Sequence, residues 1–136
     1  MVALTAPRNT PAMSGPIRAF PLPAGGKVYG GGMVAIAAAG FAVSATATAT
    51  NQSVGRADET VDNTSGANGD RRVKVRRGVF LYQNSAGGDL IGNADIGKPC
   101  YVVDDQTVAK TNAGNARPVA GIVFEVAPQG VWVEFR

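Results

Sequence analysis

The chain has 136 residues, of which 45% are hydrophobic and 17% charged, and its formal net charge is +3. This length suits one domain, and so weak a positive charge does not by itself indicate a nucleic-acid partner. The single cysteine, Cys100, excludes an intramolecular disulfide, and the absence of histidine excludes Ser-His-Asp and Cys-His catalysis and most zinc sites. We therefore predict no enzymatic activity, no cofactor and no metal site.

Residues 1–26 are interrupted by five prolines, which fix φ, remove backbone donors and favour extended geometry. The segment also lacks an apolar core of signal-peptide length. It is predicted to be an extended N-terminal arm that precedes a β-rich domain at 27–136. A disordered tail is the alternative. However, Ile17, Phe20 and Leu22 are large apolar side chains, which favour an arm that docks on another surface over a freely solvated tail.

Residues 33–37 and 41–45 are two β-compatible runs separated by Gly40, and we predict a hairpin. An Ala-rich helix is the alternative, and the low hydropathy of Ala and Thr argues against a membrane span. The next stretch, "ATATAT" (45–50), alternates methyl and hydroxyl groups as an exposed strand does. If alternation holds, one apolar face of the hairpin consists of Val34, Ile36, Phe41 and Val43.

A long loop is predicted over 54–70, where turn-forming residues gather, and a strand follows over 71–83. Its alternation predicts an apolar side, containing Val73 and Val75, and a basic side with Arg72, Lys74 and Arg76. Arg77, Val79 and Leu81 have the parity of the apolar side. The basic side is interpreted as a solvated or acid-paired sheet face, a protein-binding surface or a phosphate-binding surface.

The last third of the chain contains a turn-rich loop, with Leu90 and Ile91 as candidate anchors, and two more hairpins. One bends at "DDQ" (104–106), and the other pairs 118–126 with 130–135. Short strands joined by Gly, Asn and Asp bends predict an all-β fold, a small β-sandwich or barrel with hairpins, preceded by the arm.

Asp104 and Asp105 are adjacent carboxylates, and they raise the question of an acid pair or a metal site. Adjacent strand residues point to opposite faces, so the two carboxylates would converge only at a bend, where Asp is favoured for its backbone hydrogen bonds. We interpret them as turn residues. Cys100 is predicted to be buried, and Trp132 is either a core residue or an interface anchor.

Six segments, in this order, resemble the capsid decoration, or cement, proteins of tailed bacteriophages and prophages. They are "LTAPRNTP" (4–11), "VGRADETVDN" (54–63), "VRRGVF" (75–80), "IGKPCYVVDDQTVAKT" (96–111), "AGIVFEV" (120–126) and "GVWVEF" (130–135). The resemblance covers nearly the whole chain, and none of the segments is a catalytic motif.

The resemblance implies a non-enzymatic structural protein on the outer surface of the virion capsid, made in the host bacterial cytoplasm. Its expected partners are the major capsid protein and neighbouring copies of itself, with a homotrimer favoured and a dimer or monomer left open. No membrane is involved, and nucleic-acid binding through the basic strand 71–77 is the alternative function. The expected capsid or subunit interface comprises Leu4, Thr5, Ala6, Pro7, Arg8, Asn9, Thr10, Pro11, Arg72, Lys74, Arg76 and Trp132.

Overall fold

The structure is a computed structural model that describes residues 2–11, 13 and 15–136. Within these residues the chain forms twelve strands and two short 3-10 helices, with no α-helix. In chain order the strands are β1 (Ile17–Pro21), β2 (Gly26–Val28), β3 (Met33–Ile36), β4 (Ala42–Ser44), β5 (Gln52–Ala57), β6 (Val61–Asn63), β7 (Arg72–Arg76), β8 (Gly78–Asn84), β9 (Pro99–Val102), β10 (Thr107–Ala109), β11 (Val119–Ala127) and β12 (Gly130–Phe135), and the 3-10 helices are η1 (Gly87–Asp89) and η2 (Asn93–Asp95).

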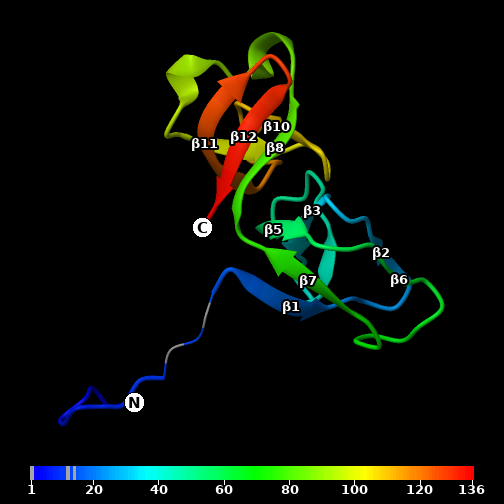
Figure 1. Cartoon of the computed structure of the whole chain (residues 1–136), viewed down its shortest axis with the longest axis vertical. Helices are drawn as coiled ribbons and strands as arrows, with labels where there is room; N and C mark the ends of the chain where they lie inside the picture. Colours follow the sequence, from blue (N-terminus) through cyan, green and yellow to red (C-terminus); the bar gives the residue numbers. More distant parts are fainter. Residues whose placement is uncertain (1, 12, 14) are drawn as a thin grey trace.

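The strands are arranged in a sheet, a ribbon and a barrel. The sheet has the order β1-β7-β5-β3-β4, the ribbon pairs β2 with β6, and the closed five-stranded barrel has the order β10-β8-β12-β11-β9. Figure 1 shows the barrel at one end of the molecule, the sheet and ribbon at the other, and the N-terminal segment leading away from the sheet. The predicted all-β class is confirmed. The described segments contain no helix long and apolar enough to cross a bilayer.

The hydrophobic interior consists of two clusters, one on either side of β3. Met33 and Ala35 join the barrel interior, whereas Val34, on the opposite side of the strand, packs with residues of the sheet and the ribbon. The predicted hairpin of β3 and β4 is confirmed. Its predicted single apolar face is wrong, because Val43 lies with Ala35 on the barrel side and both sides of the hairpin are covered.

The chain passes from the sheet to the barrel between β7 and β8. The sequence predicts one strand over 71–83, but the structure divides it at Arg77, and Gly78 at the start of β8 has a φ of 151°. Side-chain alternation does not continue through this break. Tyr82 is buried and Leu81 is exposed, so the predicted placement of Leu81 on the apolar side is wrong.

The N-terminal arm is shorter than the predicted 1–26. The chain joins the sheet at Ile17, where β1 pairs antiparallel with β7, and Leu22 is fully buried against the sheet and ribbon. The prolines allow this pairing because β1 lies at the edge of its sheet, where a missing N–H is tolerated. Met1, Ala12 and Ser14, which fall within the predicted arm, lie outside the described residues.

Two strands occur where the sequence predicts a loop, and a loop occurs where it predicts a strand. Residues 45–50 do not form a strand, because they bend into a local turn. In this turn the hydroxyls of Thr46 and Thr48 hydrogen-bond to each other, and the Thr48 N–H donates to the Thr46 carbonyl. Strands β5 and β6 lie within or next to the predicted loop 54–70. Gly55, with a φ of 140°, lets β5 approach β7 more closely than a side chain at that position would permit.

The hairpins of the last third of the chain agree with the prediction. Strands β9 and β10 pair across the "DDQ" bend, and β11 pairs with β12. In the loop before β9, Ile91 is buried whereas Leu90 is exposed, so only one of the two candidate anchors packs into the interior.

Candidate interaction surfaces

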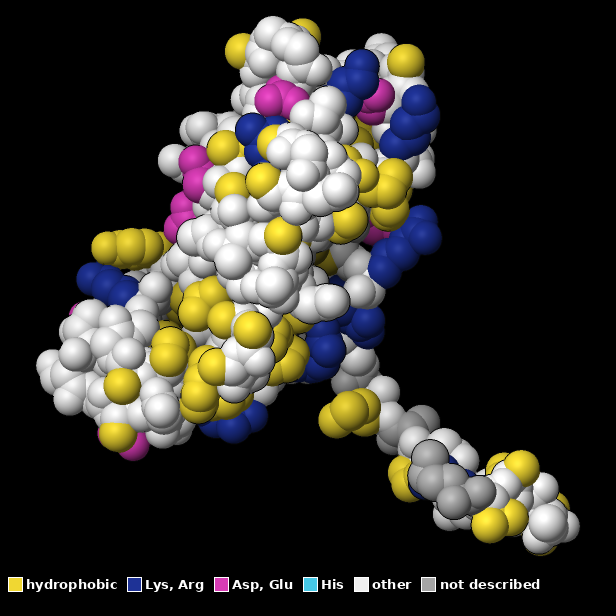
Figure 2. All heavy atoms as spheres, turned by 180° about the vertical axis from the view of Figure 1, so that it is seen from behind, with side chains coloured by type: hydrophobic (Ala, Val, Ile, Leu, Met, Phe, Trp, Pro, Cys, Tyr) yellow, Lys and Arg dark blue, Asp and Glu magenta, His cyan; other side chains and the backbone are white. Residues whose placement is uncertain are grey.

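The first candidate surface is the arm, residues 2–15, of which the structure describes 2–11, 13 and 15. Residues 2–11 form no strand or helix and are exposed, and Val2 and Leu4 keep 91% and 74% of their surface accessible. A backbone hydrogen bond from Thr10 to the Arg8 carbonyl (3.0 Å) is local to the arm. Figures 1 and 2 show the arm standing away from the body of the protein. The predicted interface residues 4–11 are therefore all accessible to a partner.

Arg77 holds the base of the arm. Its Nε donates a hydrogen bond to the Gly15 carbonyl (2.9 Å), and its backbone N–H donates to the Pro16 carbonyl (2.8 Å). These bonds determine where the arm leaves the sheet. Arg77 was predicted only as a member of the basic strand 71–77. Its parity with Val73 and Val75 was a usable signal for its role at the arm, because a charged residue on the apolar side of a strand indicates an internal partner.

The free edge of β1 lies directly after the arm. The Pro16 carbonyl and the Leu22 N–H hydrogen-bond to Arg77 and Arg71, at the two ends of β7. By alternation, the backbone groups of Ile17 and Ala19 therefore point to the free edge. The Arg72 guanidinium covers the Ala19 carbonyl (2.8 Å), and Pro21 has no N–H. Both features limit the pairing of another strand with this edge.

The second candidate surface is the basic face, which consists of Ile17, Ala19, Arg72, Lys74 and Arg76 on one side of β1 and β7. Alternation places the three predicted cations together, as expected. Arg76 contacts both carboxylate oxygens of Asp58 (3.2 and 3.3 Å), and Arg72 reaches the β1 backbone. Lys74 makes no ion pair among the described residues. Figure 2 shows a group of basic side chains where the arm leaves the body.

The third candidate surface is the barrel face, formed by outward-facing residues of β8, β11 and β12. Val131 and Val133 are buried, and Trp132 between them points outward, where it lies partly exposed opposite Leu81 and Glu125. A bulge between Val123 and Glu125 adds an extra residue to β11. The face comprises Val79, Leu81, Ile122, Phe124, Glu125, Trp132 and Glu134. Of the two alternatives for Trp132, the structure excludes the core.

Asp104 and Asp105 do not form a site. The Asp104 carboxylate accepts a hydrogen bond from the Gln106 N–H (2.9 Å), and the Asp105 backbone carbonyl accepts one from Met33 (2.8 Å). The first bond shapes the bend, and the second fastens it to the sheet. The interpretation of the two aspartates as turn residues therefore agrees with the geometry.

Cys100 is buried in the barrel interior, and its Sγ donates to the Gly121 carbonyl (3.6 Å). Burial raises the pKa of the thiol to about 11, so the thiol is protonated at neutral pH and is a poor nucleophile. The described residues contain no group of three or more ligands that could hold a metal ion.

Two grooves lined by described residues do not gather a catalytic set either. A groove of about 1080 Å³ follows β6 and contains Asp62, whose carboxylate accepts hydrogen bonds from the hydroxyl and N–H of Thr64. The hydroxyl bond to Thr64 lowers the pKa of Asp62. Another groove, of about 660 Å³, lies between Tyr29 and β8. The Asp62 carboxylate therefore stabilises the turn that follows β6.

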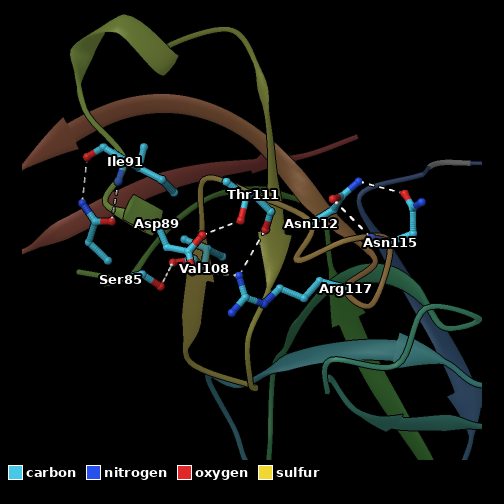
Figure 3. A network of polar contacts seen from close by, with 9 residues as sticks. Ser85, Asp89, Ile91, Val108, Thr111, Asn112, Asn115 and Arg117 are labelled. Atoms are coloured by element: carbon cyan, nitrogen blue, oxygen red, sulfur yellow. Dashed lines mark hydrogen bonds and ion pairs between the residues drawn. The ribbon is translucent and has the colours of Figure 1, made fainter. Parts of the chain in front are cut away.

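Asp89 connects the loop after β8 with the loop after β10 (Figure 3). Its carboxylate accepts hydrogen bonds from the Thr111 hydroxyl and from Arg117 (3.1 Å), and Arg117 also reaches the Thr111 carbonyl (3.2 Å). Next to it, Asn84 bonds both the N–H and the carbonyl of Ile91 (2.9 Å each), which seats that side chain in the core. The loop after β8 and the loop after β10 are thus held in one arrangement.

This network predicts an acid-sensitive loop. The Thr111 hydroxyl, followed by Arg117, lowers the pKa of Asp89 in the folded protein. The stabilisation is therefore present above the ordinary aspartate pKa of about 3.9 and is lost as the pH falls through the lower, folded-state pKa. We expect Asp89→Asn to reduce stability at pH 7 and to narrow the difference in stability between pH 7 and pH 3. Urea unfolding at both pH values measures this, and an unchanged pH dependence would contradict the role of Asp89.

No protein-family model matches the chain, and comparisons with curated proteins and with solved structures gave no match. The resemblance to capsid decoration proteins therefore stays a prediction from the sequence segments. The twelve predicted interface residues occupy three separate surfaces: the arm, the basic face and the barrel face.

Proposed function

We propose that the protein is a structural virion protein that binds the outer surface of a bacteriophage capsid and stabilises the expanded head by bridging major capsid protein subunits. The observation that carries this proposal is the exposed arm, anchored at its base by Arg77 and attached to a β-rich body. Fully extended, its fourteen residues would span roughly 45–50 Å at the usual rise per residue. Such a span suits contacts with a neighbouring subunit.

The arm would bind through its backbone and a few apolar side chains. An extended segment can add to an exposed sheet edge of a partner, where main-chain hydrogen bonds supply affinity without side-chain chemistry. Val2 and Leu4 are the apolar groups available for such a contact. Because a capsid presents many equivalent sites, weak individual contacts made by associated copies would reinforce one another.

The groups weighed as catalytic candidates have structural roles among the described residues. The chain has no histidine, the Asp104 carboxylate is used in a turn, and Cys100 is a buried thiol. In this proposal the protein acts through the three surfaces described above and not through an active site.

Removal of residues 2–11 is expected to abolish co-sedimentation with expanded capsid shells while leaving the domain folded, because these residues are exposed and their one described backbone hydrogen bond is local to the arm. A second variant replaces the same residues by a Gly/Ser segment of equal length, which separates the effect of sequence from that of length. Circular dichroism and thermal unfolding check the fold. Undiminished co-sedimentation of the shortened protein would contradict the role of the arm.

The alternative function, nucleic-acid binding, is favoured by one observation: Arg72 and Lys74 are both exposed on the basic face. Binding to phosphates would fall steeply with salt and would be weakened by Lys74→Ala, whereas it would survive removal of the arm. Under the capsid proposal, by contrast, removal of the arm abolishes binding.

A further inference from the structure

The barrel face has the composition of a protein contact. Leu81 and Phe124 keep 40% and 55% of their surface exposed, and Trp132 lies beside Leu81 on the neighbouring strand. Glu125, opposite Trp132, is exposed and makes no ion pair among the described residues. Aromatic and aliphatic groups around an unpaired acid are suited to a partner with apolar groups around a cation.

The basic face of the same chain has that complementary composition. Ile17 is 41% exposed and pairs with Arg76, and the exposed Ala19 pairs with Lys74. The Asp58 carboxylate already neutralises part of the charge of Arg76, whereas Lys74 is unpaired within the described residues. The face therefore offers apolar groups beside Lys74 and Arg72, neither of which has a carboxylate partner among the described residues.

We propose that the barrel face of one copy packs against the basic face of a neighbouring copy, with Glu125 of one copy near Lys74 of the next. This inference rests on the proposed function for the association of neighbouring copies, and it names the surfaces that associate. The molecule exposes 7887 Å² in total. A contact of standard size covers about a tenth of the surface of a small protein.

The two faces are different surfaces, so the contact is heterologous. Repetition of a heterologous contact closes into a ring when the rotation between copies permits it. In such a ring each copy uses its barrel face once and its basic face once. Because β1 belongs to the basic face and follows the arm directly, the contact would also set the spacing between the arms.

A charge exchange tests the pairing in the full-length protein without any capsid. We expect Lys74→Glu and Glu125→Lys each to weaken self-association at least about tenfold, because each places like charges together. The two substitutions combined in one chain restore opposite charges at every contact, and association should recover to within about threefold of the unchanged protein. Sedimentation velocity over a range of concentrations measures the association constants.

The apolar part of the contact is tested by Phe124→Ser, with Leu90→Ser as the matched control. Leu90 is 53% exposed on the loop after η1, outside both faces. We expect Phe124→Ser to weaken association about tenfold or more and Leu90→Ser to leave it unchanged. Urea unfolding of both variants shows whether their folds are intact.

Three results would overturn the inference. One is a full-length protein that stays monomeric at every concentration tested. Another is a combined charge variant that associates no better than either single variant, and the third is association that Phe124→Ser leaves unchanged. These outcomes can be distinguished from a failure of the proposed function, because co-sedimentation tests binding to capsid shells whereas the association assay contains no capsid.

Discussion

Replacing Leu22 with alanine is expected to lower the free energy of unfolding by about 2–5 kcal/mol, the usual cost of removing a buried leucine side chain. Leu22 is fully buried and packs with β2, β3, β6 and β7, so its truncation leaves a cavity where the sheet meets the ribbon. Its backbone also bonds to Arg71 and Gly69 (2.9 and 2.8 Å), which limits how far the chain can collapse into that space. Urea unfolding followed by circular dichroism measures the change.

The matched control is Leu4→Ala. Leu4 lies in the exposed arm, so this substitution should change the free energy of unfolding by less than about 0.5 kcal/mol. The pair of variants locates the boundary between the arm and the folded domain. Equal, small effects of both substitutions would mean that residues 17–22 do not belong to the folded unit.

Replacing Gly130 with alanine is expected to lower the free energy of unfolding by about 3 kcal/mol or more, since overpacking and a strained φ both contribute. Gly130 begins β12 with a φ of 149°, and a Cβ there would overlap the backbone carbonyl oxygen of Tyr82. The Tyr82 oxygen belongs to the main chain, and the main chain also fixes the position of the added Cβ. Neither atom can therefore move aside by a side-chain rotation. The barrel would have to open between β8 and β12.

Gly88→Ala is the control for this substitution. Gly88 lies in η1 with open space around it, so the added methyl group should change stability by less than about 0.5 kcal/mol. Thermal and urea unfolding of the two variants give the comparison, and the yield of soluble protein reports on a Gly130 variant that fails to fold. A Gly130→Ala protein as stable as the unchanged chain would contradict the tight contact between these strands.

The hairpins were predictable because their signals are local. Gly40, the "DDQ" bend and the "APQ" turn each stand between two runs of strand-forming residues, and antiparallel neighbours need only a short connection. The direction of Trp132 followed from the same kind of argument, since period-2 alternation places it opposite to Val131 and Val133. The turn role of Asp104 needed only its neighbour Gln106.

The candidate surfaces were only partly predictable. Alternation placed Arg72, Lys74 and Arg76 together, but it could not show that Asp58, in the bend after β5, pairs with Arg76. Leu81 was assigned to the wrong side, because alternation was carried through the break at Gly78. Phe124 was not recognised as part of a surface, since its exposure depends on a bulge that arises from the pairing of β11 with β12.

The sequence by itself determined the all-β class, the hairpins and the lack of histidine chemistry, because composition and residue alternation act over a few neighbouring positions. Only the tertiary structure decided that Ile17–Pro21 is a strand, that Leu22 is core and that Arg77 holds the arm. Each of these depends on a partner about 50 residues or more away in the chain. The same holds for the division into sheet and barrel, since both sides of β3 are apolar and only packing determines which cluster each side joins.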